Sequence, residues 1–231
     1  MRALIYDTVR QFTGQTTRQW LKSQRWFNPV SRFIFGYGLY SMSYYSQIES
    51  YEASSVEIIA EWMSNNFPVS KLIDVGCGPG HLTRSLATRG FSVLGIDISD
   101  ASERLVKAKG LPFQRYDLTK IGVPAGGPWD LAVCCEVAEH LDEKFAAVFV
   151  KNLVSLAKII YLTAAEPSAQ RGVGLQHLNE QPNSYWISLF AGRGFTLDIG
   201  LTASARQAFS TRVVDYLAKP MVFRPLHPSD Q

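Results

Sequence analysis

From residue 70 onward, short runs of hydrophobic residues alternate with stretches in which hydrophobic and polar positions follow a helical period. A short apolar run beside glycine or polar residues predicts a buried strand, and the periodic stretches predict covering helices. This alternation predicts an α/β fold with a doubly wound, mostly parallel sheet. The predicted strands are Lys71–Val75, Ser92–Asp97, Phe113–Asp117, Leu131–Cys135 and Ile159–Thr163.

The predicted helices lie between and after these strands, over Gly80–Arg89, Ala101–Lys109, Leu141–Leu153 and Asn183–Gly192. A further helix is predicted over Ser50–Asn66, because apolar residues recur there at helical spacing and a Phe-Pro pair ends it. Residues 123–128 are rich in glycine and proline and predict a loop. For Val213–Leu226, a helix and a closing edge strand remain alternatives, because Pro220 interrupts the segment.

Residues 1–49 differ from the rest of the chain, because they combine many aromatic rings with an excess of basic side chains. They predict two or three short helices outside the common core. We expect residues 1–49 to form a helical lid or extension and residues 50–231 to form one catalytic domain. One alternative is a helical layer that only buries these rings against the domain. Another is a basic face that contacts a membrane surface or RNA.

Composition narrows the classes of protein further. The 23 basic and 20 acidic residues give a net charge of +3, which disfavours nucleic acid as the partner without excluding it. The three cysteines, Cys77, Cys134 and Cys135, have the spacing of neither a disulfide framework nor a zinc site. No apolar run approaches the length of about 18 residues that spans a membrane, and the N-terminus lacks a signal-peptide pattern. We expect a cytoplasmic protein with a small-molecule substrate, and the sequence favours no particular oligomeric state.

A glycine loop follows the first predicted strand, in the sequence LIDVGCGPG over residues 72–80. Glycines let the backbone approach a ligand closely, and the helix after them supplies free N–H groups. Asp97 ends the second strand about 20 residues later, where a carboxylate can accept both ribose hydroxyls. Asp117 ends the third predicted strand and can meet an adenine edge. The alternatives are a loop shaped only for strand–helix packing and an NAD enzyme, whose G-x-G-x-x-G fingerprint differs from Asp-x-Gly-Cys-Gly-Pro-Gly.

This stretch resembles the class I, Rossmann-like S-adenosylmethionine-dependent methyltransferases, in their Asp-x-Gly-x-Gly-x-Gly motif and their later acidic motifs. The resemblance covers about residues 50–225 and implies a seven-stranded sheet and S-adenosyl-L-methionine as cofactor. The positions that it assigns to the cofactor are Asp74, Gly76, Cys77, Gly78, Gly80, Asp97, Ile98, Asp117 and Leu118. By the same resemblance, the glycines would cradle the methionine part, Asp97 the ribose, and Asp117 with Leu118 the adenine.

The segment after the fourth predicted strand contains Glu136, Glu139 and His140. In a doubly wound sheet, ligands bind beyond the carboxyl ends of the strands, so this segment is expected to face the reacting group. A single backbone turn there would bring them to one ion, and carboxylates with imidazole suit Mg²⁺ or Mn²⁺. His177, on the long loop after the fifth strand, is a fourth candidate. Without an ion, His140 or His177 is the predicted general base, and Glu136 is predicted to be catalytic beside them.

The Glu-x-x-Glu-His motif with a later histidine resembles the metal-dependent O-methyltransferases of ubiquinone synthesis and the terminal 2′-O-methyltransferases of small RNAs. This resemblance implies Glu136, Glu139, His140 and His177 as ligands and a direct displacement at the methyl group. The alternative is a metal-free enzyme of the same class, with Glu139 near a helix N-terminus. The leading hypothesis is O-methylation of a small metabolite. RNA-end 2′-O-methylation, N-methylation and a non-catalytic, cofactor-binding regulatory subunit remain alternatives.

Overall fold

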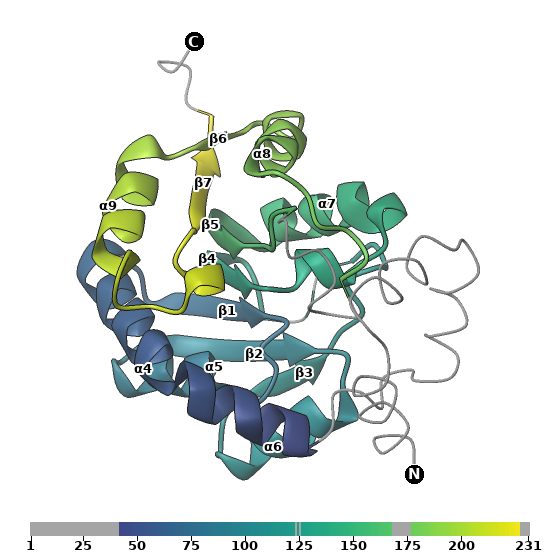
Figure 1. Ribbon diagram of the computed structural model, residues 1–231. Helices are drawn as coiled ribbons and strands as arrows, with labels where there is room; N and C mark the ends of the chain where they lie inside the picture. Colours follow the sequence, from purple (N-terminus) through teal and green to yellow (C-terminus); the bar gives the residue numbers. More distant parts are fainter. Residues whose placement is uncertain (1–41, 123, 125, 168–176, 227–231) are drawn as a thin grey trace, which may run out of the picture.

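A computed structural model describes residues 42–122, 124, 126–167 and 177–226 of the chain. Its seven strands form one sheet in the order β3-β2-β1-β4-β5-β7-β6 (Figure 1). β7 is antiparallel to both of its neighbours, and the other strand pairs are parallel. The strands are β1 (Lys71–Val75), β2 (Ser92–Asp97), β3 (Phe113–Arg115), β4 (Trp129–Cys135), β5 (Ala157–Thr163), β6 (Phe195–Leu197) and β7 (Met221–Pro225). The prediction of a doubly wound, mostly parallel, seven-stranded sheet is confirmed.

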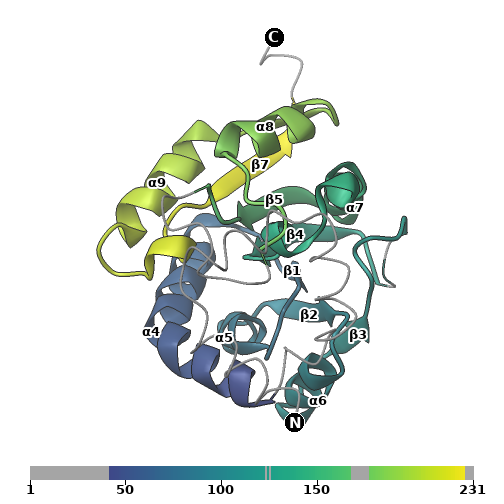
Figure 2. The same ribbon diagram turned by 45° about the vertical axis from the view of Figure 1, so that its right-hand side comes forward.

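Helices cover both faces of this sheet (Figure 2). They are α4 (Met42–Asn66), α5 (His81–Thr88), α6 (Asp100–Ala108), α7 (Ala146–Leu156), α8 (Asn183–Ala191) and α9 (Ile199–Phe209). The described residues also form three short 3₁₀ turns, η2 (Ala138–His140), η3 (Glu143–Phe145) and η4 (Asp215–Leu217). The helices α4, α5 and α9 pack on one face and α7 and α8 on the other.

Successive residues of the central strands contribute their side chains to two separate hydrophobic cores. Leu72 and Ile73 are both fully buried, yet Leu72 packs with α4, α5 and α9 while Ile73 packs with α7 and α8. This follows from the strand period of two, which turns neighbouring side chains to opposite faces. A strand buried on both faces needs a continuous apolar run, which is the pattern that predicted β1.

The predicted bounds of β1 and β2 are confirmed at both ends, whereas β4 and β5 each begin two residues earlier than predicted. The prediction that the third strand extends to Asp117 is wrong, because β3 ends at Arg115. The Asp117 carboxylate accepts hydrogen bonds from the backbone N–H and the hydroxyl of Thr119. Such a local turn competes with the strand ladder, so Asp117 lies in the loop beyond the strand.

Three other predicted elements need correction. The helix predicted from Ser50 begins at Met42, so the proposed division between residues 49 and 50 lies inside α4. The helix predicted from Leu141 begins at Ala146, because the Asp142 side chain accepts from the N–H of Lys144 and starts the 3₁₀ turn η3 first. Of the two alternatives for Val213–Leu226, the structure has a strand, β7, after the turn η4, but β7 lies between β5 and β6 and is not an edge strand. Residues 1–41, the main part of the predicted lid, lie outside the described residues.

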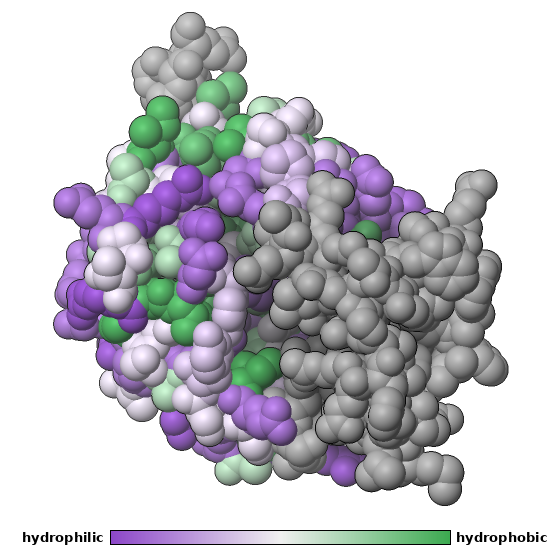
Figure 3. All heavy atoms as spheres, viewed as in Figure 1, coloured by the Kyte–Doolittle hydropathy of each residue, from purple (hydrophilic) through white to green (hydrophobic). Residues whose placement is uncertain are grey.

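No helix among the described residues is both long enough and apolar enough to cross a membrane. On the face seen in Figure 3, hydrophilic side chains separate the hydrophobic ones into small groups over the described surface. Scattered apolar side chains of this kind are normal on a protein surface.

Candidate active site

The strand order indicates at which edge of the sheet a ligand is expected to bind. From β1 the chain moves outward to β2 and β3, and then returns to β4 on the other side of β1. The connections therefore diverge between β1 and β4, and ligands of such sheets bind beyond the carboxyl ends of the strands at this switch. The ends of β1, β2 and β4 carry the glycine loop, Asp97 and Glu136 respectively.

The glycine loop joins β1 to α5 with a backbone that side chains would obstruct. Gly76 has φ 72°, and a Cβ atom there would lie 2.4 Å from Val137 Cγ2. Gly80 caps α5 with φ 76°, and its Cβ atom would lie 2.7 Å from Val106 Cγ2. Both positions therefore require glycine, because L side chains rarely adopt this conformation and neither neighbour leaves room. The loop turns into the N-terminus of α5, where backbone N–H groups point toward a ligand.

Asp74 lies beneath this loop and is buried. Its Oδ2 atom accepts a hydrogen bond of 2.6 Å from the Thr83 hydroxyl in α5. Burial raises the pKa of Asp74 to about 6, against the opposing effect of the Thr83 hydrogen bonds. Asp74 therefore joins β1 to α5 from below and holds the loop in place, whereas Thr83, its partner, was not singled out from the sequence.

Asp97 lies at the end of β2 and faces the glycine loop. Its two carboxylate oxygens accept from the backbone N–H groups of Gly78 at 3.0 Å and Ser99 at 2.8 Å. Burial raises the pKa of Asp97, although backbone hydrogen bonds from Ser99, Gly78 and Ile98 oppose that rise. Each oxygen keeps a second lone pair, so the carboxylate can also accept ribose hydroxyls. The structure thus brings Asp97, Gly78 and Ile98 together.

The remaining predicted cofactor positions lie around this group. Cys77 is buried within the loop, and burial raises the pKa of its thiol well above the ordinary value. Leu118 is buried, and Asp117 beside it is partly exposed. Burial would raise the pKa of Asp117, but the hydrogen bonds from Thr119 outweigh it and lower the pKa. Asp117 therefore offers an ionised carboxylate as an acceptor beyond β3, at the position that the sequence predicts for adenine.

Tyr45 from α4 is a further residue at the loop. It is 4% exposed, and its ring would lie 3.4 Å from a Cβ atom built on Gly78. Its hydroxyl accepts a hydrogen bond of 2.9 Å from Ser102, at the start of α6. The sequence placed Tyr45 among the aromatic residues of the N-terminal segment, and the structure assigns it to the wall of the candidate cofactor site.

A cluster of possible metal ligands lies beyond β4. Ligand atoms of Glu139, His140 and His177 all lie within 4.8 Å of one another. The turn η2 presents Glu139 and His140, and the imidazole rings of His140 and His177 meet edge to face with centroids 5.0 Å apart. Among the described residues, the carboxylate oxygens of buried Glu139 have no donor other than a protonated Glu136. A cation would supply the missing interaction, since a buried carboxylate without a partner is costly.

The loop that carries His177 is fixed to the same turn. The backbone N–H groups of Leu178 and Asn179 donate to the Glu139 carbonyl at 2.7 and 3.0 Å. His177 Nδ1 lies 2.9 Å from Glu180 Oε1. A carboxylate on one ring nitrogen orients an imidazole so that the other nitrogen faces the site, as is usual for metal-binding histidines.

Glu136, the fourth predicted ligand, is not part of the cluster of three. It is the only non-glycine residue with positive φ in the described part of the chain, at 55°. Its N–H contacts the carbonyl and hydroxyl of Thr163, each at 3.2 Å. Burial and the neighbouring Glu139 carboxylate raise the pKa of Glu136 well above its ordinary value. The raised pKa favours a protonated Glu136, whose carboxyl can donate to Glu139, so the two side chains together form a site for a shared proton or for a cation.

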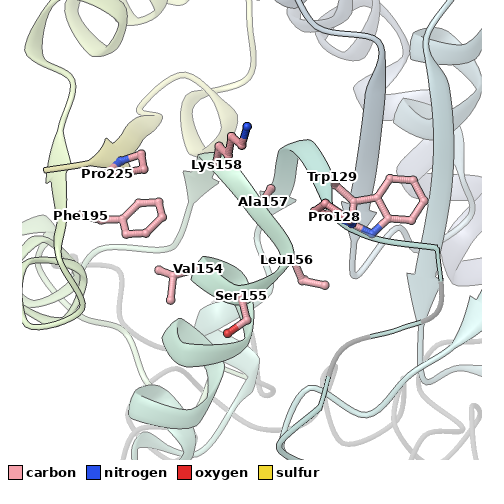
Figure 4. Close-up of a pocket in the computed structure, with 9 residues that line it drawn as sticks. All are labelled: Pro128, Trp129, Val154, Ser155, Leu156, Ala157, Lys158, Phe195 and Pro225. Carbon is pink, nitrogen blue, oxygen red and sulfur yellow. The ribbon is translucent and has the colours of Figure 1, made fainter. Parts of the chain in front are cut away.

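A separate hollow of about 330 Å³ lies at the opposite, amino edge of the sheet (Figure 4). Its mainly apolar lining comes from the starts of β4, β5 and β6, the end of α7 and the end of β7. It contains none of the predicted cofactor or metal residues. The candidate site is therefore confined to the carboxyl edge.

Comparison with known proteins bears on this arrangement. Residues 48–198 match the family described as a methyltransferase domain. A ubiquinone biosynthesis O-methyltransferase from Bordetella parapertussis is 27% identical over 158 residues, which are 60% of this chain and 61% of that protein. One from Nitrosomonas europaea is 33% identical over 124 residues, covering 51% of this chain and 48% of that protein. The chain thus matches about half to three fifths of the length of these relatives.

The fold is shared with solved structures. A magnesium protoporphyrin IX methyltransferase from Synechocystis PCC 6803 with bound SAM superposes with a TM-score of 0.55 at 21% identity. The superposition covers 91% of this chain and 96% of that one. At this identity the likeness establishes the architecture.

Proposed function

The chain belongs to the methyltransferase domain family, and on this premise we propose that it transfers a methyl group from S-adenosylmethionine to a hydroxyl of a small molecule. The observation that carries the proposal is the arrangement at the sheet switch. A glycine loop with a ribose-type acid lies at the ends of β1 and β2, and the Glu139–His140–His177 cluster lies beyond the adjacent strand β4. The proposed donor and acceptor positions thus lie at the ends of the neighbouring strands β1 and β4, which supports a direct displacement between them.

The chain's own residues would bind and orient the donor. Asp97 accepts the ribose hydroxyls, and the N–H groups at the start of α5 face the methionine carboxylate. Tyr45 closes the wall beside Gly78 and restricts access of water to the loop. Because Asp97 is itself held by two backbone N–H groups, its position is fixed before the cofactor arrives.

The acceptor side is proposed to include a divalent ion, Mg²⁺ or Mn²⁺, held by Glu139, His140 and His177. The buried Glu139 carboxylate and the His177 ring oriented by Glu180 fit such an ion. When bound, the ion would lower the pKa of a hydroxyl that contacts it. Without an ion, His177 or His140 would instead take the hydroxyl proton, and in either case Glu136, beside Glu139, would hold the acceptor. The names of the O-methyltransferase relatives support a hydroxyl as the acceptor.

Calorimetric titration of the chelator-treated full chain tests this function. S-adenosylmethionine should bind with or without metal, and Mn²⁺ should bind the wild type. In Glu139→Gln and His177→Ala, Mn²⁺ affinity should fall by more than about tenfold, because each variant removes a ligand. Glu143→Gln is the matched control, since Glu143 is an exposed acid close in sequence.

The outcomes separate the parts of the proposal. Absence of S-adenosylmethionine binding would contradict the methyltransferase activity itself. Cofactor binding with equal Mn²⁺ affinity in all four proteins would remove the metal and leave His140 or His177 as the base.

A further inference from the structure

The hollow at the amino edge of the sheet lies between two pairs of strands (Figure 4). One wall contains Trp129 of β4 and its neighbour in the ladder, Ala157 of β5. The other wall contains Phe195 of β6 and its neighbour Pro225 of β7. The ladder between β5 and β7 ends at Phe223, and Pro225 beyond it has no N–H to donate. The two strand pairs therefore separate at this edge and leave a space of about 330 Å³.

The hollow continues one face of the sheet beyond its covered part. Ile160 and Leu162 of β5 are buried in the core that α7 and α8 cover. Because side chains alternate along a strand, Lys158 lies on the same face as these two residues. Phe223 of β7 belongs to the same core, so Pro225 shares its face. Lys158 and Pro225 thus stand at the edge in rows that are apolar core positions further along both strands.

The lining of the hollow has the composition of a small-molecule site. Seven of its nine described lining residues are apolar, and the other two are Ser155 and Lys158. Leu156 and Ala157 are buried in the core, and Phe195 packs against it, so the walls are held in place. Small-molecule sites are typically hollows of about 300–1,000 Å³ with mainly apolar walls and a few polar groups. The size of this hollow, at the lower end of that range, suits a compact ligand.

Lys158 is the one charged residue among the described lining residues, and its side chain is exposed. In the described part of the chain, no carboxylate forms an ion pair with it. The carboxylate of Asp130 nearby instead accepts from the backbone N–H groups of Ser70 and Lys71, at 3.1 and 2.9 Å. A lysine stem can lie along an apolar wall while its ammonium stays in water. Lys158 therefore places a positive charge at the rim of an apolar hollow.

An organic anion with a compact apolar body complements this lining. Its body would displace water from Phe195, Pro225 and Leu156, and burial of apolar area is favourable. Its carboxylate would lie beside the Lys158 ammonium, where a cation would be repelled. Figure 4 shows Lys158 between the wall with Phe195 and Pro225 and the wall with Trp129. The same ligand can therefore reach the ammonium and both apolar walls.

We propose that this hollow binds a small organic carboxylate with a compact apolar body, and that Lys158 pairs with the carboxylate. The site is separate from the candidate active site, because the two lie at opposite ends of the same strands. β4 starts at the hollow with Trp129 and ends beside Glu136. β5 starts there with Ala157 and ends at Thr163, which contacts the Glu136 N–H. A ligand in the hollow leaves the cofactor and acceptor positions open, so the inference does not rest on the proposed function.

Calorimetric titration of the full chain saturated with S-adenosylhomocysteine tests the site. The probes are 2-naphthoate and its neutral analogue 2-naphthamide. The wild type should bind 2-naphthoate about fivefold more tightly, the effect of one partly exposed ion pair. Lys158→Gln should bind both probes alike, at the affinity of the amide. Phe195→Leu removes a ring from the wall and should weaken both probes by about threefold or more.

The indole N–H signals in ¹H–¹⁵N NMR spectra locate the bound probe. The Trp129 signal, assigned with Trp129→Phe, should shift during titration with 2-naphthoate. The signal of Trp62, which lies in the other core, should stay unchanged. Lys151→Gln is the matched control, because Lys151 is an exposed lysine of α7 outside the lining and should keep the fivefold preference. Melting temperatures exclude misfolding of the variants.

The inference is overturned if the wild type does not bind 2-naphthoate or binds both probes equally. It is also overturned if Lys158→Gln keeps the preference or if the Trp129 signal does not shift, since the probe would then occupy another place, such as the acceptor position. Failure of the proposed function is a separate result. It would appear as absence of S-adenosylhomocysteine binding, with the Trp129 shift and the effect of Lys158→Gln unchanged.

Discussion

At the scale of single residues, the candidate site contains carboxyl groups that are buried at the expense of stability. Asp74 is the clearest case, because it lies under the glycine loop with Thr83 as its hydrogen-bond donor, and no cation of the described residues lies beside it. Its pKa is raised from 3.8 to about 6 in the folded protein. Between these values the native state binds more protons than the unfolded state, so stability falls as pH rises through this window.

Asp74→Asn should therefore gain stability relative to the wild type as pH rises from 4 to 7. A pKa raised from 3.8 to about 6 corresponds to a relative gain of about 3 kcal/mol across that range. Urea unfolding at several pH values measures it. Asp130→Asn is the control of opposite sign, because backbone N–H groups of Lys71 and Ser70 lower the pKa of Asp130. A pH-independent difference between Asp74→Asn and the wild type would contradict the assignment.

The site residues show how far sequence reasoning reaches at this scale. The spacing of Asp74, the glycines and Asp97 predicted one loop, because strand and helix periods fix where those residues fall. Thr83 and Tyr45 lay beyond prediction, since their roles depend on how α5 and α4 pack. The contacts of His177 could not be predicted either, because they depend on how its loop packs against η2.

At the scale of elements, one contact holds α4 against the glycine loop. Lys109, just after α6, donates to the Pro79 carbonyl at 2.8 Å and pairs with Glu49 of α4 at 2.9 Å. The two charged side chains are only 16% and 25% exposed. Lys109 therefore connects three segments, and its removal leaves a loop carbonyl and a partly desolvated carboxylate without their partner.

Lys109→Met should lower the free energy of unfolding by about 1–2 kcal/mol. It should also speed amide hydrogen exchange in the glycine loop and in the first turns of α4. Lys107→Met is the matched control, because Lys107 is 59% exposed and pairs with Glu103 on the surface. Its effect should stay within about 0.5 kcal/mol. Equal exchange rates in the two variants would show that Lys109 does not hold the loop.

Helices and strands with a clear hydrophobic pattern could be predicted from the sequence, whereas those with a weak pattern could not. β1 and β2 are buried on both faces and read as continuous apolar runs. The helix α9, with the sequence IGLTASARQAF, has small and polar residues that leave little helical pattern. Its one signal is Asp198, whose side chain caps the helix at the N–H of Leu201. The three-residue strand β6 is too short to carry a period at all.

At the scale of the whole molecule, the two hydrophobic cores share one sheet. Trp62 of α4 belongs to one core and Trp186 of α8 to the other, and both are buried. Each central strand contributes side chains to both cores, so neither can melt while the other keeps its strands in place. Single, cooperative unfolding is the expected result.

Chains labelled with fluorotryptophan can test this coupling by ¹⁹F NMR during urea unfolding, with Trp62→Phe and Trp186→Phe assigning the two signals. The native signals of Trp62 and Trp186 should disappear at the same urea concentration. Two distinct midpoints would mean that the faces unfold independently and that the strand alternation does not couple them.

The left-handed backbone conformation of Glu136 lowers the stability of the fold, while its side chain is proposed to serve the activity. A glycine at position 136 would relieve strain of about 1–2 kcal/mol and remove a buried carboxylate, so the resting protein would tolerate more heat. The same change would remove the side chain that is proposed to hold the acceptor. Laboratory evolution that rewards heat resistance alone would therefore drift toward an inactive scaffold, as expected where selection for turnover maintains a strained residue.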